Sequence, residues 1–230
     1  MYLNKNPFQI ELTKTSDGSH TLKLLGVDEQ YHSLNGAMQE SEHVFIQAGF
    51  NSVIENKNPV NILEVGLGTG LNALLTLKES TELQKQVYYD AIEAYPLKKK
   101  WLDRLNYPSL LRDDWYKEGF KLIHQATDDT FLTIREVFRI RCLKKKIQDV
   151  ELIKEKYDLV YFDAFGPDTQ PEMWTVEVFD KIEKAMRSGA VLVTYSVKGA
   201  VRRAMKEAGF DVKKIPGPPG KREMTRAVKI

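Results

Sequence analysis

Short apolar segments alternate with longer amphipathic segments along most of the chain. The apolar segments have the length of buried strands, and the segments between them repeat their apolar positions at helical spacing. Strands are expected at residues 62–65, 87–93, 121–125, 157–163, 190–196, 210–215 and 222–230. Helices are expected at residues 71–78, 127–153, 174–186 and 199–208. This alternation predicts an α/β fold on a mostly parallel sheet with right-handed crossovers. Only a Pro- and Gly-rich turn at 216–220 separates the last two strands, so the final strand is expected to be antiparallel.

A different pattern precedes the sheet. Residues 8–25 alternate weakly between apolar and polar side chains, and Asp17-Gly18 in their middle is a hairpin turn signal. Residues 37–55 have the pattern of a helix. We therefore expect residues 1–58 to form an N-terminal extension of β-hairpin and helix, and residues 59–230 to form the main domain.

A glycine-rich turn follows the first strand of the sheet. The sequence of residues 61–72, NILEVGLGTGLN, places Gly66, Gly68 and Gly70 between that strand and a helix start. Glycines let the backbone approach a ligand closely, and a helix start offers free N–H groups and a positive dipole end. The spacing differs from the dinucleotide pattern, which has two residues between its second and third glycines. The turn predicts a site for a nucleotide-like cofactor; a purely structural turn is the alternative.

The motif E-x-G-x-G-x-G resembles the first motif of class I methyltransferases, which bind S-adenosylmethionine (AdoMet). The resemblance implies AdoMet as the cofactor and a Rossmann-like, seven-stranded sheet whose last strand is antiparallel. It assigns to cofactor binding the residues Glu64, Gly66, Leu67, Gly68, Thr69, Gly70 and Asn72.

Two acidic residues near strand ends are candidates for further cofactor contacts. Glu93 ends the second strand, where a carboxylate can accept hydrogen bonds from both ribose hydroxyls of a nucleoside. Class I enzymes often place an acid after the third strand, against the adenine amine. Here Asp128 is displaced from that position, and it is expected either to reach the ring edge or to cap the next helix.

Asp163 ends the strand at 157–163, at the edge of the sheet where ligands bind. A carboxylate there faces the transferred methyl group. It can orient the lone pair of an amine nucleophile and favour the cation that forms in the transition state. A carboxylate of ordinary pKa is a poor base for an alkylammonium, so orientation and electrostatics are favoured over proton abstraction. A strand-end aspartate that only caps the next segment is the alternative.

The residues around and after Asp163 make the resemblance more specific. The chain is similar to the bacterial tRNA 5-methylaminomethyl-2-thiouridine methyltransferases, which occur as stand-alone enzymes (MnmD type) and as the methyltransferase half of bifunctional MnmC. The likeness is carried by Asp163-Ala164-Phe165-x-Pro167, Pro171-x-Met173-Trp174, Gly199-x-Val201-Arg202-Arg203, Ala208-Gly209-Phe210 and Lys221-Arg222-Glu223-Met224. Upstream it extends to Asn35-Gly36, Glu40-Ser41 and Val44-Phe45.

This resemblance implies a concrete reaction. A methyl group would pass from AdoMet to the primary amine of 5-aminomethyl(-2-thio)uridine at the tRNA wobble position, giving 5-methylaminomethyl(-2-thio)uridine. Asp163 would be the catalytic residue, Ala164 would border the cofactor, and the tRNA anticodon region would be the partner. The base pocket would be formed by Phe165, Pro167, Met173 and Trp174. For Trp174, a role as a core anchor is an equal alternative. The flavin oxidase half is missing from these 230 residues, so a separate FAD-dependent oxidase partner is expected.

Charge is distributed unevenly along the chain. The net charge is +2, yet residues 196–230 carry ten Lys and Arg against three Asp and Glu, a local excess of seven positive charges. Such asymmetry favours an anionic partner such as nucleic acid, with a solvated basic surface as the alternative. The turn after residue 215 lies at the ligand-binding edge of the sheet, so Lys221 and Arg222 are expected to meet phosphates.

The cysteine and histidine content and the length of the apolar segments limit the kinds of site and the location that are expected. The single cysteine, Cys142, excludes an internal disulfide and a cysteine-based zinc site, and the four scattered histidines predict no metal. No apolar segment reaches the ~18 residues of a membrane span, so a cytoplasmic protein is expected. Two other functions stay open. A small-amine transferase of the spermidine-synthase type predicts an acidic tunnel, and a non-catalytic RNA-binding module predicts no AdoMet affinity.

Overall fold

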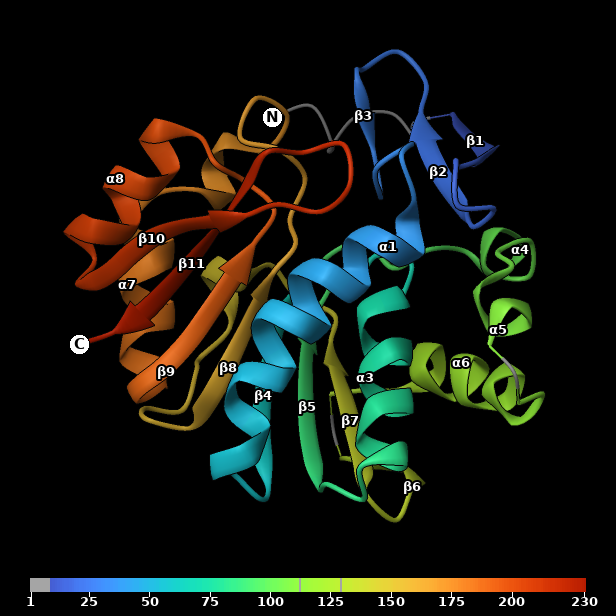
Figure 1. Ribbon diagram of the computed structural model, residues 1–230, viewed down its shortest axis with the longest axis horizontal. Helices are drawn as coiled ribbons and strands as arrows, with labels where there is room; N and C mark the ends of the chain where they lie inside the picture. Colours follow the sequence, from blue (N-terminus) through green and yellow to red (C-terminus); the bar gives the residue numbers. More distant parts are fainter. Residues whose placement is uncertain (1–8, 112, 129) are drawn as a thin grey trace.

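The computed structural model describes residues 9–111, 113–128 and 130–230. Its centre is an eight-stranded sheet in the order β10-β11-β9-β8-β4-β5-β7-β6 (Figure 1). The strands are β4 (Val60–Val65), β5 (Val87–Ile92), β6 (Leu132–Arg135), β7 (Phe138–Leu143), β8 (Tyr157–Phe162), β9 (Met186–Thr194), β10 (Phe210–Pro216) and β11 (Glu223–Lys229). β4 pairs in parallel with β5 and β8, and the parallel pairing continues to β7 on one side and β9 on the other. β11 is antiparallel to both β9 and β10, as expected for the last strand.

Helices cover both faces of this sheet. The helical elements are α1 (Ala37–Ser41), η1 (Glu42–Phe50), α2 (Asn51–Val53), η2 (Ile54–Asn56), α3 (Leu71–Glu82), α4 (Lys99–Leu102), α5 (Tyr107–Leu110), α6 (Trp115–Gln125), η3 (Ile147–Asp149), η4 (Pro171–Met173), α7 (Val176–Ala185) and α8 (Gly199–Glu207). Figure 1 shows the helical segment 37–56 running across the sheet beside α3. Successive residues of β4 serve opposite faces, because side chains alternate along a strand. Ile62 packs in the core formed with η1, α3 and α6, whereas Leu63 packs in the core formed with α7 and α8.

A small three-stranded sheet precedes the helical segment. It consists of β1 (Ile10–Lys14), β2 (His20–Leu24) and β3 (Glu29–Gln30). β1 and β2 are antiparallel and pair from Ile10–Leu24 to Lys14–His20, so the predicted hairpin is confirmed. Leu22 joins the same core as η1 and α3. The division of the chain at residue 58 stays a prediction.

The predicted third strand was wrong. Residues 121–125 belong to α6, which buries Tyr116, Phe120 and Ile123 at helical spacing. The third parallel strand is β7, inside the region 127–153 that was predicted as a helix. Its sequence, FRIRCL, alternates strictly between buried and half-buried side chains, as a strand with one wetter face does. β6 pairs with β7 as an antiparallel edge strand, which is why the sheet has eight strands rather than seven.

The described residues include no helix that is both long enough and apolar enough to cross a membrane.

Candidate active site

A cleft of about 1190 Å³ opens at the carboxyl ends of β4, β5 and β8. Predicted site residues among its lining are Gly66, Gly68, Glu93, Asp163, Ala164, Phe165 and Met173. A second cavity of about 110 Å³ adjoins it and is lined by Glu29, Glu40, Tyr195 and Lys221 among others. Tyr31, Asp163, Ala164 and Phe165 line both spaces, so Asp163 stands where the cleft and the small cavity meet.

The glycine turn brings the backbone against the end of β8. Gly66 has φ +93°, and a Cβ on it would lie 2.6 Å from the carbonyl oxygen of Asp163. Any larger residue would therefore separate the turn from the strand that carries Asp163. The turn continues into α3, and Gly70, with φ +74°, is the residue immediately before that helix. The sequence motif is thus a close-packing requirement of the fold, besides its predicted role in cofactor binding.

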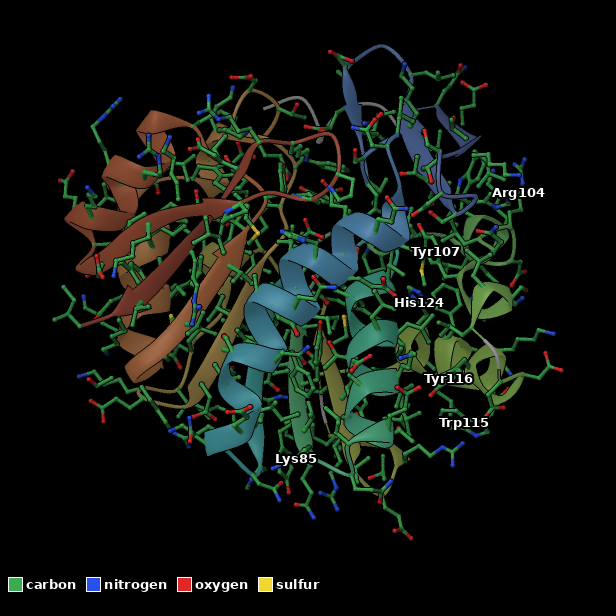
Figure 2. The ribbon with its side chains drawn as sticks, viewed as in Figure 1. Lys85, Arg104, Tyr107, Trp115, Tyr116 and His124 are labelled. Atoms are coloured by element: carbon green, nitrogen blue, oxygen red, sulfur yellow. The ribbon has the colours of Figure 1, made fainter. Side chains whose placement is uncertain are left out.

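Two histidines, His32, which is buried, and His124, which is half-buried, hold the glycine turn through Thr69. The Nε2 atom of His32 hydrogen-bonds the Thr69 hydroxyl at 2.6 Å, and His124 on α6 donates from Nε2 to the Thr69 carbonyl at 3.1 Å. Burial lowers the pKa of each histidine to about 4, so both are neutral at pH 7. Figure 2 shows His124 on α6 beside α3. Sequence reasoning missed both histidines, since they reach Thr69 from 37 and 55 residues away.

Glu93 lies at the end of β5 with both carboxylate oxygens on backbone N–H groups. Its Oε2 accepts from Gly68 N at 2.9 Å, and its Oε1 accepts from Tyr95 N at 2.7 Å. Burial raises its pKa. A carboxylate has about four acceptor positions, so Glu93 retains capacity for hydroxyl donors while it fixes the glycine turn.

Asp163 belongs to a chain of polar groups that runs into the core. The Nδ2 atom of Asn72 donates to Asp163 Oδ2 at 2.8 Å and to Glu64 Oε1 at 2.9 Å. Burial raises the pKa of Glu64 well above its usual range, and the hydrogen bond from Asn72 opposes that rise. Asn72 and Glu64 are buried and lie outside the residues that line the cleft, and they support Asp163 from behind.

The pKa of Asp163 is raised to about 7. Burial is the main cause, and the charges of Glu40 and Glu29 add to it, against the opposing effects of the Asn72 hydrogen bond and Lys221. A carboxylate with this pKa takes up a proton far more readily than an ordinary aspartate does. The sequence-based preference for orientation and electrostatics over proton abstraction assumed an ordinary pKa for Asp163, and that assumption does not hold.

The segment after Asp163 is fixed by Trp174. Its indole Nε1 donates to the Phe165 carbonyl at 2.8 Å, and its ring packs edge-on against Phe162. Trp174 is only 5% exposed and lies outside the residues that line the cleft, which is the geometry of a core anchor. Phe165 and Met173 do line the cleft, and Phe165 meets Tyr31 edge-on with ring centroids 4.9 Å apart.

Several predicted residues lie away from the cleft. Leu67 and Thr69 are buried behind the glycine turn, and Pro167 is half-buried beyond Phe165. Asp128 is exposed and faces Lys145, with its Oδ2 at 3.8 Å from Nζ. The third strand ends at Leu143 rather than at residue 125, so the loop after β7 lines the cleft in place of Asp128. That loop contributes Lys145, Lys146, Ile147, Gln148 and Asp149.

The two basic residues of the β10–β11 turn differ in their surroundings. Arg222 is exposed. Lys221 is half-buried, and its ammonium donates to Glu40 Oε1 at 2.5 Å and lies 4.8 Å from the centre of the Tyr195 ring. Lys221 therefore lines the small cavity in this structure, although it was expected to meet phosphates.

Within the described residues, no three His, Cys, Asp or Glu side chains are grouped so that they could hold a metal ion.

Comparisons with known proteins agree with this geometry. The sequence profile of an S-adenosyl-L-methionine-dependent methyltransferase family matches residues 109–230. The chain is 31% identical over 220 residues to the tRNA 5-methylaminomethyl-2-thiouridine biosynthesis bifunctional protein MnmC of Cupriavidus metallidurans, covering 87% of this chain and 31% of that protein. It is 30% identical over 235 residues to the MnmC of Aromatoleum aromaticum, covering 94% and 34%. The chain thus spans about a third of the length of these curated relatives.

Solved structures show the same relationship. The crystal structure of MNMC2 from Aquifex aeolicus matches with a TM-score of 0.78 and 28% identity, covering 98% of this chain and 72% of that one. A spermidine synthase from Thermotoga maritima matches with a TM-score of 0.58 at 14% identity, covering 100% and 72%, and shares the fold. The resemblance drawn from the motifs around Asp163 is confirmed, and the chain belongs to the S-adenosyl-L-methionine-dependent methyltransferases.

Proposed function

We propose that this protein methylates the primary amine of 5-aminomethyl(-2-thio)uridine at the wobble position of tRNA. The observation that carries the proposal is Asp163, a carboxyl with a pKa of about 7 between a cofactor-sized cleft and a small acidic cavity. The small cavity suits an aminomethyl group, and the cleft suits AdoMet. The likeness to MnmC proteins, whose name states a role in 5-methylaminomethyl-2-thiouridine biosynthesis, supports tRNA as the acceptor.

The residues around the cleft fit AdoMet. Gly66 and Gly68 supply a side-chain-free backbone edge, Glu93 retains acceptor capacity for ribose hydroxyls, and Ala164 leaves space next to Asp163. AdoMet, when bound, supplies an electrophilic methyl group on a positively charged sulfur. Two carboxyl groups, Glu93 and Asp163, line the same cleft and complement that positive charge.

We infer two tasks for Asp163. An alkylammonium must lose a proton before its nitrogen can act as a nucleophile, and Asp163 accepts that proton because burial has raised its pKa. Asp163 then holds the neutral amine by a hydrogen bond and directs the lone pair. Asn72 keeps the carboxyl in place, so it acts as a positioning residue in this proposal.

The wobble base would lie against Phe165 and Met173, which line the cleft. Trp174 fixes the loop that carries them through its hydrogen bond to the Phe165 carbonyl. Flipped RNA bases are usually held by stacking on aromatic side chains. Arg222 would meet backbone phosphates of the anticodon region. A protein with this substrate would act in the cytoplasm, and an FAD-dependent oxidase activity would supply the aminomethyl precursor.

Mass spectrometry of wobble nucleosides from tRNA of a deletion strain tests the proposal. We expect 5-aminomethyl(-2-thio)uridine to accumulate, and a plasmid-borne wild-type copy to restore the methylated nucleoside. A plasmid-borne Asp163→Asn copy should fail to restore it. An unchanged nucleoside profile in the deletion strain would reject the function.

A further inference from the structure

The small cavity beside Asp163 has the composition of a cation site. Three carboxyl groups line it, those of Glu29, Glu40 and Asp163, and Lys221 is the one basic lysine or arginine among its described lining residues. Glu40 is 7% exposed, and its Oε2 accepts from Ser33 N at 2.8 Å while its Oε1 accepts from Lys221. His32 also lines the cavity but is neutral at pH 7, because burial lowers its pKa to about 4.

An aromatic face completes the site. The Lys221 ammonium lies 4.8 Å from the centre of the Tyr195 ring, within the range of a cation–π interaction. The Tyr195 hydroxyl donates to the Ala164 carbonyl at 2.9 Å, and Glu29 Oε2 accepts from Gly166 N at 2.9 Å. Both contacts tie the cavity walls to the loop that follows Asp163. The ammonium of Lys221 is therefore held as a ligand ammonium would be, by a carboxylate and a ring face, next to the reacting carboxyl.

We propose that this cavity binds the primary ammonium of the acceptor, and that Lys221 is a resident cation that keeps it closed to free amines. The inference rests on the proposed function, since it identifies where the amine of that acceptor is recognised. A phosphate of bound tRNA would attract Lys221 away from Glu40, and the substrate ammonium would take its place. An enzyme built in this way discriminates against small amines, because these carry no phosphate to draw Lys221 out.

The charge balance supports an exchange of cations. One lysine faces three carboxyl groups, so a vacated site retains a strong preference for a positive charge. Lys221 sits in the turn between β10 and β11 and its side chain is 34% exposed, so its ammonium has a path to the surface. Glu40, by contrast, is fixed by Ser33 and stays in the cavity.

The test measures binding of free 5-aminomethyluridine to the protein saturated with S-adenosylhomocysteine, by isothermal titration calorimetry. Lys221→Met removes the resident charge and keeps the side-chain length. We expect it to tighten binding of 5-aminomethyluridine by about tenfold relative to wild type, the size of one desolvated cation interaction. Binding of 5-hydroxymethyluridine, which lacks the charge, should change by less than about twofold on the same grounds.

Two further variants complete the test. Adding Glu40→Gln to Lys221→Met should abolish the gain in affinity for 5-aminomethyluridine, because a neutral amide of nearly the same volume then replaces the carboxylate. Lys214→Met is the matched control, because Lys214 also forms an ion pair, with Glu223 at 2.6 Å, but lies outside the cavity. The proposal is overturned if Lys221→Met binds the amine no more tightly than wild type. It is also overturned if the hydroxymethyl nucleoside gains equally, or if Glu40→Gln leaves the gain intact.

A parallel measurement separates this inference from the proposed function. Wild-type protein is incubated with AdoMet and tRNA that carries 5-aminomethyluridine. Absence of the methylated nucleoside would refute the function, whatever the calorimetry shows. Methylation of the tRNA without the amine-selective gain in Lys221→Met would refute the cation site alone.

Discussion

The raised pKa of Asp163 predicts that the affinity for AdoMet depends on pH near neutrality. With a pKa of about 7, the carboxyl is about one-tenth ionised at pH 6 and about nine-tenths ionised at pH 8. The ionised form attracts the sulfonium of AdoMet, whereas the sulfur of S-adenosylhomocysteine is neutral. If only protein with ionised Asp163 binds AdoMet tightly, the affinity follows the ionised fraction. The AdoMet affinity then rises by up to about tenfold from pH 6 to pH 8.

The assay is direct binding of both compounds at pH 6, 7 and 8 by calorimetry or fluorescence. The α-amino and carboxylate groups are common to both ligands, so their titration cancels in the ratio of the two affinities. We expect the ratio to favour AdoMet increasingly as the pH rises in wild type, and to be flat in Asp163→Asn. Asparagine keeps an acceptor for Asn72, so the variant changes the charge with little change in packing. An equal pH dependence for both ligands, or a slope that survives in Asp163→Asn, would refute the assignment of this carboxyl.

Two further predictions concern the glycine turn. In Gly70→Ala the new Cβ would lie 2.7 Å from His124 Nε2 at a backbone φ of +74°, and we expect a lower Tm and weaker S-adenosylhomocysteine binding. Gly26→Ala is the control, because it carries a similar backbone strain, about 1–2 kcal/mol, while its new Cβ would have no neighbour within 4 Å. If both variants lost the same ligand affinity, the predicted clash with His124 would be contradicted. The second prediction concerns the contribution of the two histidines to stability in acid. The unfolded chain protonates His32 and His124 near pH 6.5 and the folded protein only near pH 4, so their contribution to the free energy of unfolding should fall as the pH drops from 6.5 to 4, opposite in sign to that of Asp163, whose pKa is raised. Chemical denaturation of wild type and His124→Gln across this range should show the free energy of unfolding of wild type falling relative to that of the variant as the pH drops, and a constant difference would exclude His124 as a contributor.

Local features of the sequence predicted the core of the site well. β4, the glycine turn and α3 are contiguous, and their spacing alone predicts strand, turn and helix. Glu93 and Asp163 were found because the ends of parallel strands meet at one edge of a sheet. The positions of both are therefore a consequence of topology, which alternating strands and helices already imply.

The errors arose where local patterns were ambiguous. The five-residue window at 121–125 fits a strand and a helix equally well, and the longer pattern from Trp115 decides for a helix. That error shifted the expected adenine contact to Asp128 and away from the loop after β7. Arg139 and Arg141 lie on the half-buried face of β7 and give its sequence the two-residue period of a strand, which the helix prediction for residues 127–153 overlooked.

Other features depend on contacts between distant residues. Lys221 was expected at the edge of the sheet and lies there, but its partner Glu40 is 181 residues away. Asn72 was expected to contact the cofactor, yet it links Glu64 to Asp163 inside the core. The pKa of Asp163 depends on burial by elements from both halves of the chain, so no local pattern could have predicted it.

The central claim is that Asp163 serves methyl transfer to an aminomethyl group on tRNA. Purified protein, methyl-labelled AdoMet and tRNA bearing 5-aminomethyluridine test it most directly, with nucleosides resolved by mass spectrometry after digestion. We predict labelled 5-methylaminomethyluridine with wild type, and a loss of at least about a hundredfold in rate with Asp163→Asn, the usual contribution of a positioned acid or base. Label on another nucleoside, or full activity in Asp163→Asn, would contradict the account.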